Sequence, residues 1–310
     1  MSRIAALLIG AAFALPATAQ EAASCKQVTF SDVGWTDITA TTAVATTILD
    51  ALGYQTETRM LALPVTFTAM STNDLDVFLG LWMPSMEADI APYRDAGTVE
   101  IIHTNLTGAK YTLATNRVGA DLGISDFASL AAHEQALGRK IYGIEPGNDG
   151  NRLLIEMVAE DKFGLGTFQI VESSEQGMLG QVARETRAGK PIVFLGWEPH
   201  PMNNAFDLTY LSGGDDIFGP DLGGAVVQTT TRAGYVTECP NVGKFLQNLT
   251  FTLDMENQIM GAILNDRAQP RDAARDWLKD NPDTALIWLD GVSAQDGRDA
   301  VEVLTAALEG

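Results

Sequence analysis

The chain has little positive charge: 20 lysine and arginine residues stand against 40 aspartate and glutamate residues, and the formal net charge is −20 at pH 7. Phosphate backbones and anionic membrane surfaces repel so acidic a protein, which argues against nucleic-acid and membrane partners. The balance favours the attraction of cations. An acidic composition can also serve only to keep a protein soluble, so the charge alone does not identify a ligand.

Cysteine and histidine are scarce, with two and three copies respectively. So few ligands do not make a convincing metal site, and we expect neither a metal nor another cofactor. The Gly-x-Ser-x-Gly turn that presents the nucleophile of many esterases is absent. One histidine, His200, lies near the tryptophan motifs described below, but Pro199 and Pro201 flank it and favour a fixed turn. The sequence therefore favours a binding protein over an enzyme.

Long hydrophobic runs are also absent, and the run at residues 4–15 is too short to span a bilayer. It follows a basic residue and precedes a small-residue cleavage site that ends at Ala19. This is the pattern of a signal peptide over residues 1–19, so we expect export. In an oxidising compartment Cys25 and Cys239 are expected to form a disulfide.

Strand-like and helix-like apolar patterns alternate along the chain, which is typical of α/β proteins with largely parallel sheets. The pattern restarts after residue 113, and we expect two lobes: residues 22–113 with 226–310, and residues 114–225 inserted between them. Strands at residues 109–116 and 225–231 would cross between the lobes as a hinge. Other expected strands include residues 77–80, 99–104 and 191–195, and the expected helices include residues 36–52, 126–136, 150–159, 253–264 and 293–308.

The most informative pattern is an apolar strand that runs into glycine, tryptophan and proline, and it occurs twice. Trp82 follows one such strand, Trp197 follows the other, and Trp35 comes after a related third strand. Side chains at the ends of buried strands lie where α/β proteins bind ligands. Tyr111, on the first crossing strand, would face the same cleft. Four aromatic faces suit a quaternary ammonium ion, which the ring quadrupole attracts; the alternative is that the rings are ordinary core residues.

Two polar residues accompany these rings. Asp37, two residues after Trp35, would place a carboxylate in the cavity, where it complements a cation and accepts a hydrogen bond from a hydroxyl. The alternative is an acid that stabilises a helix N-terminus. Asn148 lies between a strand and a helix, so its amide could reach the far end of a ligand or simply cap the helix.

Together these segments resemble the periplasmic choline-binding receptors among the quaternary-amine (glycine betaine type) solute receptors of bacterial ABC transporters. The resemblance covers essentially the whole chain after the signal peptide, and it implies a two-lobed, hinged fold. It implies that the three tryptophans and Tyr111 form a box, with Asp37 and Asn148 at the hydroxyethyl end of the ligand. The segments that carry it are residues 30–38, 78–84, 106–111, 143–151 and 194–197.

Asp37 also selects among such ligands. Glycine betaine would bring a carboxylate beside Asp37, whereas choline offers a hydroxyl, so we expect choline, with acetylcholine as a weaker ligand. The alternatives left open are glycine betaine, carnitine and trimethylamine N-oxide and, in another class, an exported choline-ester hydrolase. We expect a monomer in the periplasm that captures its ligand by lobe closure and delivers it to a permease with its ATPase.

Overall fold

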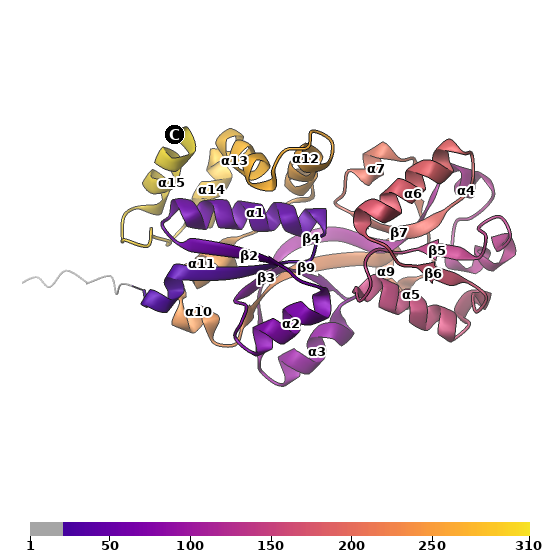
Figure 1. The fold of residues 1–310 in the computed structure, drawn as a ribbon, viewed down its shortest axis with the longest axis horizontal. Helices are drawn as coiled ribbons and strands as arrows, with labels where there is room; N and C mark the ends of the chain where they lie inside the picture. The colour runs from indigo at the N-terminus through magenta and orange to yellow at the C-terminus, as the bar shows by residue number, and fades with distance from the viewer. Residues whose placement is uncertain (1–20) are drawn as a thin grey trace, which may run out of the picture.

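The structure is a computed structural model that describes residues 21–310; the expected signal peptide lies outside the described residues. Within this range, nine strands form one mixed sheet with helices on both faces (Figure 1). The strand order is β2-β1-β3-β9-β4-β7-β5-β6, and β8 pairs with β4 off this path. The strands are β1 (Gln27–Asp32), β2 (Gln55–Met60), β3 (Val77–Met83), β4 (Val99–Asn116), β5 (Lys140–Tyr142), β6 (Gln169–Val171), β7 (Val193–Glu198), β8 (Leu208–Tyr210) and β9 (Gly224–Arg232).

Strands β4 and β9 form the middle of the sheet and run from one half of the molecule into the other (Figure 1). β4 pairs antiparallel with β9 from Val99 to Lys110 and with β7 from Lys110 to Thr115, so one strand belongs to both halves. On its other side β9 pairs with β3. The sequence predicts two strands here, at residues 99–104 and 109–116. The structure instead has one strand of 18 residues, and its ladder with β9 contains three register shifts.

The first half contains the parallel strands β1, β2 and β3. Helix α1 (Thr36–Ala51) covers one face and packs against the C-terminal helices, while α2 (Leu63–Ser71) and α3 (Glu87–Asp95) lie on the opposite side (Figure 1). None of the helices in residues 21–310 combines the length and the apolar character needed to cross a bilayer. The remaining helices of this half are α10 (Tyr235–Glu238), α11 (Pro240–Asn248), α12 (Leu253–Leu264), α13 (Pro270–Asp280), α14 (Pro282–Trp288) and α15 (Ala300–Glu309).

The second half contains β5 and β6, which run parallel to each other and to β7, and the short β8. Helix α5 (Asp149–Ala159) is capped by Asn148, and α6 (Glu175–Arg187) is capped by Ser174. The Ser174 side chain accepts a hydrogen bond from the Gly177 amide at 3.1 Å. Such caps fix where a helix starts. The smaller helices of this half are α4 (Arg117–Asp121), α7 (Met202–Ala205), α8 (Asp215–Phe218) and α9 (Pro220–Gly223).

Two helices expected from the sequence are wrong in extent. Residues 126–136 form two short 3-10 turns, the first of which is capped by the Asp126 side chain, which accepts a hydrogen bond from the Ser129 amide at 2.7 Å. Residues 293–308 become helical only at α15, because Gly297 turns the backbone to a φ of +87°. In both places local turn chemistry overrides the apolar pattern.

The expected disulfide between Cys25 and Cys239 is present, with Cα atoms 5.4 Å apart. It joins a short 3-10 helix before β1 to the segment between α10 and α11. Glu21 supports the same connection, because its Oε1 accepts a hydrogen bond from the Asn241 amide at 2.6 Å. The start of the described chain is therefore attached to the helices that follow β9.

Candidate functional site

Three aromatic side chains come from strands β3, β4 and β7 at the centre of the sheet. Tyr111 on β4 lies directly opposite Trp197 on β7, and the ring centroids are 6.3 Å apart at an angle of 80°. The ring centroid of Trp82, on β3, is 6.0 Å from that of Tyr111. Paired residues on adjacent strands share a face of the sheet, which brings the first two rings together. Trp82 and Trp197 are the penultimate residues of their strands, whereas the sequence placed them just beyond the strand ends.

Trp35 approaches these rings from the turn between β1 and α1. Gly34 has a φ of +87°, which favours glycine, and the Trp35 carbonyl accepts the first bond of α1 from the Thr39 amide at 2.8 Å. The indole Nε1 of Trp35 donates to the Glu145 carboxylate, which belongs to the other half of the molecule. The ring is therefore held by both halves.

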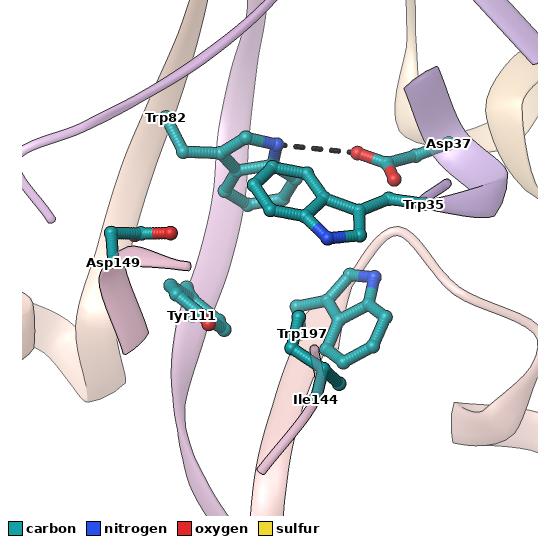
Figure 2. A pocket seen from close by; sticks show the side chains of 7 residues that line it. All are labelled: Trp35, Asp37, Trp82, Tyr111, Ile144, Asp149 and Trp197. Atoms are coloured by element: carbon teal, nitrogen blue, oxygen red, sulfur yellow. Dashed lines mark hydrogen bonds between the residues drawn. The ribbon is translucent and has the colours of Figure 1, made fainter. Parts of the chain in front are cut away.

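Figure 2 shows these rings around a small cavity. The four aromatic side chains are only 4–6% exposed. The structure brings together every ligand-binding residue expected from the sequence except Asn148. The lining residues are Trp35, Asp37, Trp82, Tyr111, Ile144, Asp149 and Trp197.

Asp37 lies in the first turn of α1 and is buried beside the rings. Trp82 Nε1 donates to its Oδ2 at 3.2 Å, whereas its Oδ1 has no hydrogen-bond partner (Figure 2). Burial, and then the nearby Glu175 carboxylate, raise the pKa of Asp37 to about 7. Burial and the charge of Asp37 likewise raise the pKa of Glu256, on α12, well above its usual range. This corner of the cavity is rich in acids, and a cation bound there would stabilise their ionised forms.

Asn148 is not among the residues that line the cavity. Its Oδ1 accepts a hydrogen bond from the Asn151 amide at 2.8 Å, and its Nδ2 donates to the Glu145 carbonyl. Both ends of the amide are thus engaged in starting α5, which is the capping role that the sequence left open. A direct contact between Asn148 and a ligand stays a prediction.

Sequence reasoning missed Ile144 and Asp149, which line the cavity on either side of Asn148 in the chain. The signal that could have found them is their place between the end of β5 and the first turn of α5, because ligand sites gather at such strand-to-helix connections. Ile144 looks like the apolar end of a strand, and Asp149 looks like an ordinary first-turn acid of a helix. Neither residue type stands out by itself.

Polar contacts around the cavity join the two halves. The Glu175 carboxylate, from the first turn of α6, accepts hydrogen bonds from the Thr36 backbone amide at 2.9 Å and from the Thr36 hydroxyl. Since Trp35 provides no side-chain cap for α1, Glu175 takes that role from across the cavity. Arg152 of α5 donates to Asp89 of α3 at 2.9 Å. The two halves are therefore closed on each other.

His200 packs beside the cavity rather than lining it. Its ring centroid is 5.0 Å from that of Trp197, its Nδ1 accepts from the Met202 amide at 2.9 Å, and its Nε2 faces a Glu175 oxygen at 3.3 Å. The lining residues within the described part of the chain include no histidine, serine or cysteine. The cavity thus offers no nucleophile with an adjacent imidazole base, which the hydrolase alternative would need.

The family model described as the substrate binding domain of ABC-type glycine betaine transport systems matches residues 26–280. A curated relative, the glycine betaine/carnitine transport binding protein GbuC of Listeria monocytogenes, is 32% identical over 130 residues, which is 42% of this chain and 42% of that protein.

Two solved structures are more similar. An ABC-transporter choline binding protein in complex with choline is 64% identical, with a TM-score of 0.92, and the match covers 93% of this chain and 100% of that one. An ABC-transporter choline binding protein in an unliganded semi-closed conformation is 65% identical, with a TM-score of 0.85 over 92% of this chain and 99% of that one. The present structure thus superposes better on the complex than on the unliganded protein.

Proposed function

The chain belongs to the family of substrate-binding domains of ABC-type glycine betaine transport systems, and from that premise we propose that it captures choline for an ABC importer. The family and the similar solved structures are substrate-binding components of transporters, not enzymes. One observation carries the choice of ligand class: four buried aromatic rings surround a cavity that also holds the Asp37 carboxylate. A similar protein, 64% identical, was solved with choline bound.

The rings supply what a trimethylammonium group requires. Its charge is spread over methyl groups, it has no N–H to donate, and the aromatic face offers both negative potential and apolar contact. Each face contributes about 0.5–2 kcal/mol, so four faces support binding in the micromolar range. The same box would accept glycine betaine, carnitine or trimethylamine N-oxide, and the choice among them depends on the polar residues.

Asp37 favours choline among these ligands. Its free Oδ1 can accept a hydrogen bond from the ligand hydroxyl, and its charge complements the ammonium group. A betaine carboxylate in the same place would put two like charges together in a buried site, which is unfavourable. Acetylcholine, which lacks the hydroxyl but keeps the cation, is the expected weaker ligand.

Capture would occur by closure of two lobes. We assign residues 22–113 and 226–310 to one lobe and residues 114–225 to the other, with β4 and β9 as the hinge. Trp35 and Trp82 then come from the first lobe and Trp197 from the second, so a ligand that touches all three stabilises the closed state. The closed form, as a periplasmic monomer, would be the species that the membrane permease and its ATPase recognise.

The first test is calorimetric titration of the protein with choline and glycine betaine, alone and after Asp37→Asn. We expect the wild type to prefer choline, and we expect the substitution to reduce that preference about tenfold, because the amide neither pairs with the cation nor repels a carboxylate. No choline binding by the wild type would refute the proposed function. An unchanged choline-to-betaine ratio in the variant would remove Asp37 from the selectivity argument.

A second test uses Gly150, in the first turn of α5. An added Cβ there would lie 2.0 Å from the Tyr111 hydroxyl oxygen, so Gly150→Ala should push the tyrosine ring and weaken choline binding by about 1 kcal/mol or more. Gly180→Ala in α6 is the matched control, because its Cβ would come no closer than 3.6 Å to the end of Arg184. Equal choline affinity in the two variants would contradict the placement of Tyr111 in the box.

A further inference from the structure

Asp149 is an acidic residue that lines the cavity. Neither the sequence analysis nor the role proposed for Asp37 explains why a carboxylate lies there. It is the first residue of α5, it is 1% exposed, and neither of its carboxylate oxygens has a hydrogen-bond partner. Figure 2 shows its carboxylate directed toward the space between Trp82 and Tyr111. Buried carboxylates are normally paired with a cation or hydrogen-bonded, so this group is suited to a positively charged partner from outside the protein.

The neighbouring charged groups do not provide that partner. Arg152, one turn along α5, directs its guanidinium group to Asp89, to the Ser85 carbonyl at 2.9 Å and to Glu156. The charge of Arg152 lowers the pKa of Asp149, but the charge of Asp89 raises it. The Ser85 hydroxyl donates to the Trp82 carbonyl at 3.3 Å and is close enough to Asp149 to lower its pKa, but it carries no charge. The Tyr111 phenol and the Asp37 carboxylate are the remaining titratable groups that line the cavity, and neither carries positive charge.

A first-turn acid often needs no other role than to stabilise its helix dipole. Glu175 shows what a buried acid in that position looks like when its role is structural: Thr36 donates to it twice, and His200 lies at 3.3 Å. Asp149 has the same place in α5 and a similar burial, yet it has none of these bonds. The contrast indicates that the Asp149 side chain faces the cavity and does not make the structural contacts that Glu175 makes.

We propose that Asp149 is a second anionic ligand-binding residue, placed across the cavity from Asp37, and that the two carboxylates together restrict the site to ligands with a net positive charge. This inference rests on the proposed function. Asp37 comes from α1 in one half and Asp149 from α5 in the other, so a cation between them draws the two halves together. A zwitterion, whose own carboxylate neutralises its ammonium group, receives no such net attraction.

A change in proton binding on ligand binding is an expected consequence of this arrangement. Burial, and then the charge of Asp89, raise the pKa of Asp149 to about 7 against the opposing effect of the Ser85 hydroxyl. Burial and Glu175 raise the pKa of Asp37 to the same value. A bound cation favours the ionised acids and therefore lowers both pKa values. Binding near pH 7 should release protons, and affinity should fall as the pH drops from 8 to 5.5, because protonated acids must then be deprotonated first.

The test is calorimetry on the full chain after Asp149→Asn, with choline, tetramethylammonium and glycine betaine as ligands. Loss of the charge should weaken choline and tetramethylammonium at least about tenfold, and betaine markedly less. Asp272→Asn is the matched control, since Asp272 is an exposed first-turn acid of α13 and lies outside the cavity. A loss for choline with none for tetramethylammonium would overturn the charge role, because only a hydroxyl contact would then remain.

A measurement on the wild type covers the case in which the variant does not fold. Choline is titrated at pH 7 in two buffers with different heats of ionisation, and the difference gives the number of protons released. We expect clear release that persists in Asp37→Asn, where Asp37 can no longer supply a proton, and no release from that variant would overturn the proposal. If the wild type fails to bind choline, the proposed function itself fails. If the wild type binds choline and Asp149→Asn stays within twofold of it for all three ligands, only the second anionic residue is refuted.

Discussion

Replacing Trp82 by alanine is expected to weaken choline binding by about 1–3 kcal/mol, or about 5- to 150-fold, while the protein stays folded. The substitution removes one aromatic face from the box. It also removes the Nε1 donor that holds Asp37 Oδ2 at 3.2 Å, so the carboxylate loses its orientation. One side of this ring already faces empty space, which limits the packing lost on truncation. Titration calorimetry together with thermal unfolding separates the two effects.

Trp288→Ala is the matched control for this variant. Trp288 is 1% exposed, lies against Phe251 and Trp277, and is not among the residues that line the cavity. Its truncation should lower the free energy of unfolding by about 3–5 kcal/mol but leave the choline affinity of the folded protein unchanged. If Trp82→Ala instead unfolds the protein and Trp288→Ala impairs binding, the box assignment is wrong.

Removing the Cys25–Cys239 disulfide is also expected to have a large effect on stability. Its cysteines are 214 positions apart, and closing a loop of that length stabilises the native state by about 5 kcal/mol in the chain-entropy model, with measured losses for native disulfides of about 2–5 kcal/mol. We expect a loss in this range for the double variant Cys25→Ser, Cys239→Ser, measured by urea unfolding.

Reduced wild-type protein provides the control, since it loses the bond without a change of side chain. Choline affinity should be the same in all forms, because both cysteines lie outside the cavity lining. The contacts from Glu21 to Asn241 and from Ser24 to Glu238 remain available to hold the start of the described chain in place. A stability change below about 1 kcal/mol would show that these contacts, and not the covalent bond, secure this segment.

Much of the fold could be predicted because the apolar patterns are regular. Helix α12 has the expected limits, Leu253–Leu264, and α1 differs from its prediction by one residue. The failures have local causes. Strand β8, with three residues, is too short to show a period, and β4 looked like two strands because Gly108 interrupts its apolar pattern. Sequence patterns also cannot show that β9 inserts between β3 and β4.

The aromatic part of the site could be predicted for a similar reason. Repeated strand ends with glycine and tryptophan mark Trp82 and Trp197 as equivalent positions in the two halves, and such a repeat is rare by chance. The acids are harder to assign. Asp37, Asp149 and Glu175 all occupy the first turn of a helix, and only the three-dimensional contacts show which of them caps a helix and which faces the cavity.

The position of the disulfide has one more consequence. Every segment that contributes to the cavity, from Trp35 to Trp197, lies between Cys25 and Cys239 along the chain. A protease that cuts a surface loop anywhere in this interval produces two fragments that remain covalently attached. Such nicked molecules should keep the mass of the intact protein under non-reducing electrophoresis and separate only when a thiol is added, so the protein can survive backbone damage without losing half of its binding surface.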